Sequence, residues 1–212
     1  MIALIDYGAG NLTSVKKALS AIGAAVAVPT TPDELWRADA VIVPGVGHFG
    51  ATRALDAHWV DAIRGLVERG RPMLGICLGM QWLFEGSDEA PDCPGLGLLS
   101  GRCVRLRGTT AAADSVPAHS LKVPHVGWNA LDRRREAPLV HGVSTGAQVY
   151  FTHSYAAPVT ADTVAATEHG EEFAAIVQRD HIAGVQFHPE KSGEVGLTIL
   201  RNFVRCAGRS GS

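Results

Sequence analysis

The stretch PMLGICLGMQ, residues 72–81, decides the fold, because it leads from an apolar strand into a helix through a cysteine set between two glycines. A turn this tight forces an unfavourable backbone conformation, and we expect a positive φ at Cys77. Gly75 and Gly79 would remove the clashes that side chains two residues away would cause. The pattern has the logic of a nucleophile elbow with sulfur in place of oxygen. The alternative is a core cysteine near flexible glycines.

Strand-like and helix-like segments alternate on either side of this turn in the first half of the chain. Apolar runs predict strands at 2–7, 24–30, 39–45 and 72–77. Helices are predicted from the N-cap Asn11 to Gly23, at 32–35, at 51–69 and again directly after Cys77. This alternation favours an α/β fold with a mostly parallel central sheet and helices on both faces.

The second half is richer in strands, and no linker divides the chain. Strand-like segments lie at 96–106, 125–131, 148–156, 163–169, 173–180 and 182–190, with a tight turn at 179–184 and a final helix at 193–208. Residues 108–120 have the composition of a long mobile loop, and residues 209–212 that of a frayed tail.

Composition and charge exclude several classes of protein. With 46% apolar and 19% charged residues over 212 positions, the chain is globular rather than disordered. A net charge of -2 gives no general case for nucleic-acid binding, and we expect no membrane segment and no signal peptide. Four cysteines without C-x-x-C spacing indicate free thiols and a cytoplasmic protein.

The segment GVQFHPEKS, residues 184–192, offers a base for the cysteine and a group to orient that base. His188 ends an apolar strand, and Glu190 lies two residues on, a spacing that returns to the same face of an extended chain. Pro189 between them would stiffen the geometry. A structural histidine and a solvated glutamate are the alternatives. Together with the elbow, the pair favours a Cys77–His188–Glu190 triad.

A glycine-rich loop, PGVGHFG at 44–50, follows the third predicted strand. Such a loop can aim backbone N–H groups at an anion, although many are only turns. No P-loop lysine is present, and we predict no nucleotide site. The remaining histidines form no ligand spacing, and we predict neither a metal nor another cofactor.

These motifs, together with IALIDYGAGNLTSV (2–15), KVPHVGWN (122–129) and FTHSY (151–155), resemble the class I, or triad, glutamine amidotransferases. More closely, they resemble the family of glutaminase subunits of imidazole glycerol phosphate synthase. The resemblance covers nearly the whole chain and implies a single flavodoxin-like amidotransferase domain over 1–208. It implies hydrolysis of glutamine, with the ammonia channelled to a cyclase subunit in histidine biosynthesis.

The resemblance also assigns roles by position. Cys77 would attack the glutamine amide, His188 would transfer protons, and Glu190 would orient His188. The backbone of Val46, Gly47 and Leu78 would bind the oxyanion. The substrate-binding positions implied are Gly47, Gln81, Glu89, His153, Ser154 and Tyr155. For Gln81 a solvated helix residue is the alternative, and for Ser154 a local cap at a strand end.

The resemblance implies a heterodimer with a cyclase that is a (β/α)₈ barrel. The implied contacts are Asn11, Trp128, Tyr150 and Lys191, although Trp128 and Tyr150 could be core aromatics and Lys191 solvated. Two other functions stay open: a triad glutaminase of another pathway, such as pyridoxal phosphate synthesis, and a degenerate amidotransferase fold that serves only as a scaffold. The motifs at 6–11 and 123–129 speak against the first, and the complete triad against the second.

Overall fold

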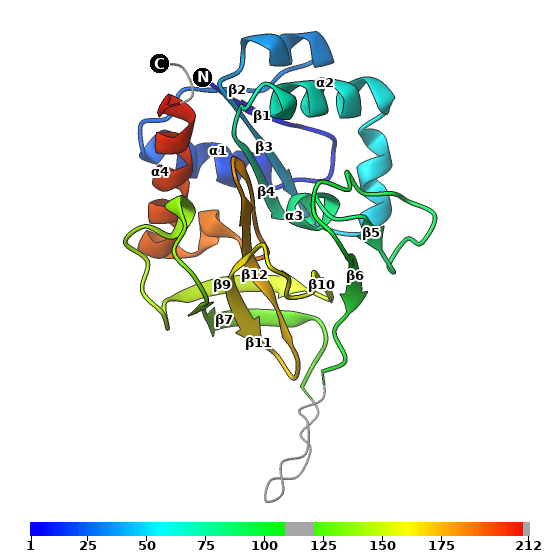
Figure 1. The fold of residues 1–212 in the computed structure, drawn as a ribbon, viewed down its shortest axis with the longest axis vertical. Coiled ribbons are helices and arrows are strands. Elements are labelled where there is room, and N and C mark those ends of the chain that lie inside the picture. Colours follow the sequence, from blue (N-terminus) through cyan, green and yellow to red (C-terminus); the bar gives the residue numbers. More distant parts are fainter. Residues whose placement is uncertain (109–120, 210–212) are drawn as a thin grey trace, which may run out of the picture.

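A computed structural model describes residues 1–108 and 121–209 of the chain (Figure 1). Most of the predicted loop at 108–120 and the last residues of the predicted tail therefore lie outside the described residues. The central element is a sheet in the order β2-β1-β3-β4-β13-β12-β11-β8. In that order its strands are Val26–Ala27, Ile2–Leu4, Ala40–Gly45, Met73–Cys77, Ile182–Val185, Glu172–Arg179, Thr163–Glu168 and Asp132–Arg133.

The sheet is parallel over its first five strands, from β2 to β13, and antiparallel from β13 to β8. The α/β fold with a mostly parallel sheet, predicted from the sequence, is confirmed. Short connections join β11 to β12 and β12 to β13, and such connections are possible between antiparallel neighbours. In the predicted turn at 179–184, Arg179 pairs with Ile182, and Asp180 between them has a φ of 52°.

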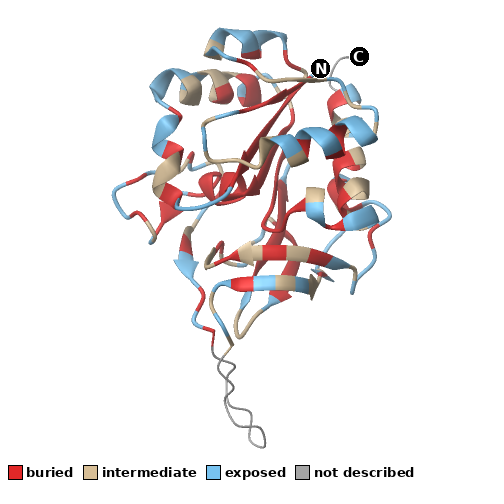
Figure 2. Cartoon of the chain, turned by 180° about the vertical axis from the view of Figure 1, so that it is seen from behind, coloured by how far each residue is buried: buried red, intermediate tan, exposed pale blue. Residues whose placement is uncertain are grey.

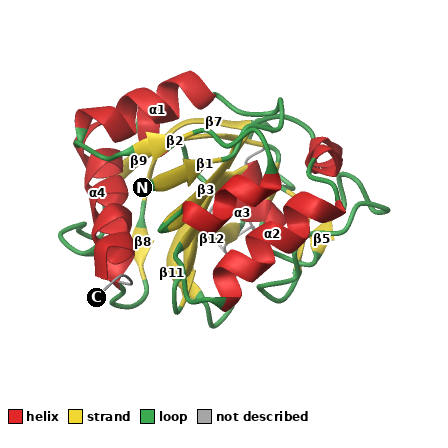
Figure 3. Cartoon of the chain, turned by 90° about the horizontal axis from the view of Figure 1, so that it is seen from above, coloured by secondary structure: helices red, strands yellow, loops and turns green. Residues whose placement is uncertain are grey.

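Helices cover both faces of the sheet (Figure 3). Helices α1 (Leu12–Ala21) and α4 (Gly193–Arg209) pack on one face, and α2 (Ala57–Glu68) and α3 (Leu78–Trp82) on the other. Two hydrophobic clusters fill the two layers, and the central strands between them are buried (Figure 2). No helix among the described residues is long and apolar enough to span a membrane.

Two helix starts show how capping side chains set boundaries. Asn11 caps α1, as predicted, by accepting a hydrogen bond from the Ser14 N–H at 3.4 Å. The single helix predicted at 51–69 is wrong: a 3₁₀ turn, η2 (Phe49–Ala54), precedes α2. The Asp56 carboxylate accepts hydrogen bonds from the first N–H groups of α2, so it starts a new helix where apolar spacing alone suggested continuity.

The other strands form two small sheets beside the carboxyl end of the central sheet. Strand β7 (His125–Ala130) pairs with β9 (Gln148–His153), and the ribbon they make crosses below β4 in Figure 1. A three-stranded sheet joins β10 (Tyr155–Ala156), β6 (Arg102–Arg105) and β5 (Gly86–Ser87). Three further 3₁₀ turns are η1 (Pro32–Arg37), η3 (Pro138–Val140) and η4 (Pro189–Lys191).

Candidate active site

Cys77 lies at the carboxyl end of β4 with φ 52° and ψ −107°, as the elbow prediction required a positive φ. The two glycines are needed for close packing of the turn. A Cβ on Gly75 would lie 2.4 Å from the carbonyl oxygen of Gly79, and one on Gly79 only 1.8 Å from the carbonyl oxygen of Val43. Helix α3 can therefore begin directly against β3 and β4, and this holds Cys77 at the carboxyl end of β4.

His188 and Glu190 form a buried pair, with 2.8 Å between Nδ1 and Oε1 and with side chains only 2% and 1% exposed. The expected extended geometry is wrong, because Glu190 belongs to the 3₁₀ turn η4, which begins at Pro189. The turn rather than strand alternation brings the carboxylate back to the ring. Nε2 of His188 is buried and has no hydrogen-bond partner among the described residues.

Two opposing effects act on the pKa of His188. Burial of the ring alone would lower it. Hydrogen bonding to Cys77 and Glu190, together with the negative charge that each carries when ionised, more than offsets burial and raises this pKa. A ring held between these two groups is a strong proton acceptor.

Strand register brings the cysteine and the histidine together. Val185, the last residue of β13, pairs in parallel with Ile76, the residue before Cys77. The segment that follows β13 and carries His188 therefore lies beside the carboxyl end of β4. Ligands of open α/β sheets bind outside such carboxyl ends.

A cavity of about 280 Å³ opens at this edge. Its lining residues are Gly47, Cys77, Leu78, Gln81, Glu89, Pro124, Thr152, His153, Ser154 and Tyr155. All predicted substrate-binding positions are thus brought together around Cys77. Sequence reasoning did not single out Pro124 and Thr152, although both lie in the quoted motifs KVPHVGWN and FTHSY.

The polar side chains of the cavity have defined partners. Gln81 is 4% exposed, and its Nε2 donates to the Tyr155 carbonyl at 2.8 Å and to Oε1 of Gln186 at 3.1 Å. The Glu89 carboxylate accepts from the Phe49 N–H at 2.6 Å, which ties the cavity wall to η2. A solvated Gln81 is therefore excluded.

Val46 does not line this cavity, unlike its neighbour Gly47. Its N–H donates to the carbonyl oxygen of Ala9 at 2.5 Å, and the residue is 37% exposed. In the geometry described, the Val46 N–H is therefore directed to the loop after β1 rather than to an oxyanion at Cys77.

Three residues missed by sequence reasoning also contribute. Nε2 of the fully buried Gln186 donates to Sγ of Cys77 at 3.6 Å. The Tyr7 hydroxyl lies against Gly45, where a Cβ would be 2.2 Å from it, and is buried without a hydrogen-bond partner among the described residues. Burial and the nearby Cys77 raise the pKa of Tyr7. In the sequence, Gln186 and Tyr7 follow apolar strands and lie in quoted motifs, but no other feature indicates a role in the site.

A pair of neutral histidines backs the cavity. Nδ1 of His153 lies 2.9 Å from the Tyr155 carbonyl, so this nitrogen carries the proton, and Nε2 accepts from Nδ1 of His125 at 3.1 Å. The third missed residue is His125, whose Nε2 lies 3.3 Å from the amide nitrogen of Asn129. Burial lowers the pKa of His153 to about 3, and burial together with His169 lowers that of His125 to about 4.

The predicted partner-contact residues fall mostly on one surface. Trp128 of β7 pairs in register with Tyr150 of β9, with ring centroids 6.2 Å apart, and the ammonium of Lys191 lies 5.7 Å from the Tyr150 ring. Trp128 is 57% exposed, which excludes a core aromatic. The Tyr150 carbonyl accepts from the His188 N–H at 2.9 Å. Asn11 instead caps α1, in a narrow cleft that also borders His188.

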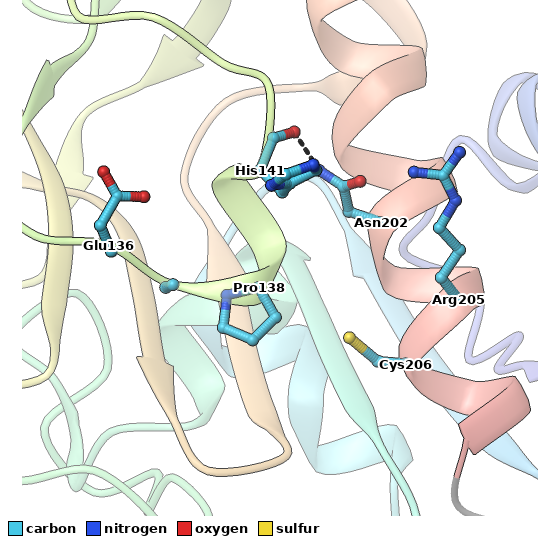
Figure 4. Close-up of a pocket in the computed structure, with 7 residues that line it drawn as sticks. Glu136, Pro138, His141, Asn202, Arg205 and Cys206 are labelled. Atoms are coloured by element: carbon cyan, nitrogen blue, oxygen red, sulfur yellow. Dashed lines mark hydrogen bonds between the residues drawn. The ribbon is translucent and has the colours of Figure 1, made fainter.

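A larger cavity, of about 630 Å³, lies between η3 and α4, away from Cys77 (Figure 4). Figure 4 shows Asn202 reaching the carbonyl of His141, and Arg205 and Cys206 on the same helix. None of the predicted site residues lines it, so the chemistry is assigned to the smaller cavity. No cluster of three His, Cys, Asp or Glu side chains suited to a metal occurs among the described residues.

The fold, the strained cysteine turn and the buried His–Glu pair define a class of protein. Residues 3–206 match the family described as Glutamine amidotransferase class-I, and the chain belongs to that family. In fold it is similar to a solved structure described as PurLQS from Thermotoga maritima, with a TM-score of 0.73, 20% identity and coverage of 96% of this chain and 97% of that one.

Sequence identity to individual relatives is much higher than the identity to that solved structure. The chain is 44% identical over 208 residues to the imidazole glycerol phosphate synthase subunit HisH of Bacillus cereus, covering 96% of this chain and 93% of that protein. It is 47% identical over 211 residues to the HisH subunit of Geobacillus kaustophilus, covering 98% of this chain and 97% of that protein.

Proposed function

We propose that this chain is the glutaminase subunit of an imidazole glycerol phosphate synthase. It hydrolyses glutamine to glutamate and ammonia and delivers the ammonia to a separate cyclase. The observation that carries the proposal is Cys77 in its strained turn, beside the buried His188–Glu190 pair. The likeness to the HisH subunits over nearly the whole chain supports the pathway. A cytoplasmic location is part of the proposal, because it suits a biosynthetic role of this kind.

The chemistry follows from the three side chains. His188 takes the proton of the Cys77 thiol, and the sulfur attacks the side-chain carbonyl carbon of glutamine. When the C–N bond breaks, His188 returns the proton to the departing ammonia, and a glutamyl thioester remains. Water then attacks the thioester, giving one proton to His188, which passes it to the sulfur as glutamate leaves. Glu190 holds the ring and stabilises its charged form.

The cavity walls supply recognition. Both amide hydrogens of Gln81 are donated to the protein, so its oxygen is the atom left to accept a hydrogen bond from the substrate's ammonium. Glu89 adds a negative charge at the same cavity. The backbone N–H groups of Leu78 and Gly47, which line the same cavity as Cys77, are the proposed oxyanion donors.

The hydrogen bond made by Val46, the third proposed oxyanion donor, supports the proposal that a partner controls hydrolysis. The Val46 N–H is occupied by the Ala9 carbonyl, so hydrolysis by the chain alone should be slow. Binding of the cyclase, itself occupied by its nucleotide substrate, would release this N–H toward the cavity and complete the oxyanion hole. Gating prevents the loss of glutamine without synthesis.

The surface made by Trp128, Tyr150 and Lys191 is the proposed docking face for the (β/α)₈ cyclase. An exposed tryptophan beside a tyrosine suits an interface. The face adjoins the active site through the hydrogen bond from the His188 N–H to the Tyr150 carbonyl. Ammonia could therefore pass to the partner in the resulting heterodimer without being protonated in water.

The test is steady-state glutamate release by the purified chain alone, with the cyclase, and with the cyclase plus its ligand. We expect slow release by the chain alone and a stepwise rise on each addition. Cys206→Ala is the matched control for Cys77→Ala, because Cys206 lies on α4 and does not line the cavity at Cys77. This variant should keep the stepwise rise in glutamate release. Full activity of the isolated chain, unchanged by either addition, would favour an independent glutaminase of another pathway.

A further inference from the structure

Among the described residues, Gln186 donates a hydrogen bond directly to the sulfur of the proposed nucleophile, Cys77. It follows the last residue of β13, and its N–H still pairs with the Ala175 carbonyl of β12 at 2.9 Å. Because Val185 pairs with Ile76, the next step of the parallel register sets Gln186 beside Cys77.

The hydrogen bonds of Gln186 fix the orientation of its amide. Its Oε1 accepts from Nε2 of Gln81 at 3.1 Å, so its Nε2 is the atom that faces Sγ of Cys77, at 3.6 Å. Gln186 is 0% exposed, and water therefore cannot replace either contact without a rearrangement. A buried amide with both ends engaged is costly to alter.

The same contacts fix the amide of Gln81. One hydrogen goes to the Tyr155 carbonyl and the other to Gln186. Without the acceptor on Gln186, the Gln81 amide would have one unpaired hydrogen and could turn its nitrogen toward the cavity. A nitrogen there would repel an ammonium group, whereas the oxygen accepts a hydrogen bond from it.

We infer that Gln186 is a positioning residue that donates a hydrogen bond to the Cys77 sulfur and orients the Gln81 amide oxygen toward the substrate. The inference rests on the proposed function, because it takes Cys77 as the nucleophile. The donor favours the thiolate, since a hydrogen bond to a charged acceptor is stronger than one to a neutral acceptor. One residue thus links activation of the nucleophile to recognition of the amino-acid end of the substrate.

Two variants separate the two contacts. Gln186→Glu retains an acceptor for Gln81 but, once ionised, has no donor for the sulfur. Gln186→Leu has neither group. Gln178→Leu is the matched control: Gln178 is also buried, but it bonds the Leu139 N–H and the Asp180 carbonyl at the far end of β12.

The measurements are the pH profile of Cys77 alkylation by iodoacetamide, followed by mass spectrometry of the Cys77 peptide, and the KM for glutamine of the cyclase complex. For both Gln186 variants we expect the midpoint of alkylation to move up by about one pH unit. For Gln186→Leu, KM should also rise about tenfold, whereas Gln186→Glu should stay within about threefold of the parent. Gln178→Leu should match the parent in both measurements.

Alkylation profiles and KM values of folded Gln186 variants that overlie the parent would overturn the inference. Should Gln186→Leu fail to fold, the alkylation profile of Gln186→Glu alone decides. Failure of the proposed function has a different signature: the unaltered chain would show no selective labelling of Cys77 by the glutamine analogue 6-diazo-5-oxo-L-norleucine and no glutamate release with the cyclase.

Discussion

Backbone strain at Cys77 can be measured by comparing Cys77→Gly with Cys77→Ala. Both changes remove the thiol, so both abolish the chemistry, but only alanine keeps a Cβ. With φ 52° and ψ −107°, Cys77 lies outside the left-handed region that ordinary residues tolerate. Such a conformation costs about 1–3 kcal/mol for a residue with a Cβ.

Glycine relieves this cost but has its own. It raises the conformational entropy of the unfolded chain, which is worth about 0.4–1 kcal/mol against the folded state. The difference leaves Cys77→Gly more stable than Cys77→Ala by about 1 kcal/mol. At an unstrained strand position the sign is reversed, and glycine is the less stable by about 0.5–1 kcal/mol.

Urea unfolding of the purified chain measures the free-energy difference. Ala183 of β13, buried and without a positive φ, provides the control. Ala183→Gly should unfold at lower urea than the parent, whereas Cys77→Gly should unfold at higher urea than Cys77→Ala. If Cys77→Ala proved the more stable of its pair, as at an ordinary strand position, the elbow would store no strain and the reasoning would fail.

Three further predictions concern the triad, the elbow and the histidines behind the cavity. His188→Ala should lose nearly as much glutaminase activity as Cys77→Ala, and Glu190→Ala less, because Glu190 acts only through the ring; an equal or larger loss from Glu190→Ala in a folded protein would reverse the assigned roles. Gly79→Ala should lower the melting temperature as well as activity, because its Cβ would lie 1.8 Å from a β3 carbonyl oxygen; a normal melting curve would contradict the packing described. Burial lowers the pKa of His153 from 6.5 to about 3, so the unfolded chain takes up a proton at a higher pH than the folded chain does. The stability that the neutral ring contributes above about pH 6.5 is therefore lost as the pH falls toward 3. His153→Gln should therefore flatten the fall in unfolding free energy over this range, and an unchanged slope would argue against a neutral buried ring.

The elements that the sequence predicted well are those whose physical cause is local. Asn11 caps a helix with its own side chain, and the glycines around Cys77 mark a turn that needs them. The helix at 51–69 was misread because apolar spacing continues through Asp56, whose carboxylate starts a second helix. The short strands β5 and β8, of two residues each, exist only through their partners and carry no pattern of their own.

The site was predicted at the level of motifs rather than of contacts. His188 and Glu190 were paired for the wrong reason, since a 3₁₀ turn and not an extended chain joins them. No local pattern indicates a role for Gln186, because its two partners, Cys77 and Gln81, lie more than a hundred residues away in the chain. Parallel register brings them together, and register between strands distant in sequence cannot be read from either strand alone.

Exposure within the proposed active site indicates where control can enter. The side chains of His188 and Glu190 are almost completely buried and Cys77 is 5% exposed, so a partner cannot reorganise them without opening the core. Val46 is 37% exposed, and a single hydrogen bond to Ala9 holds its N–H away from the cavity. Exchanging that bond for one to an oxyanion would turn the peptide between Gly45 and Val46, at the end of β3. A partner that favours the exchange would accelerate hydrolysis through the most accessible part of the machinery, while the nucleophile and its base stay preorganised.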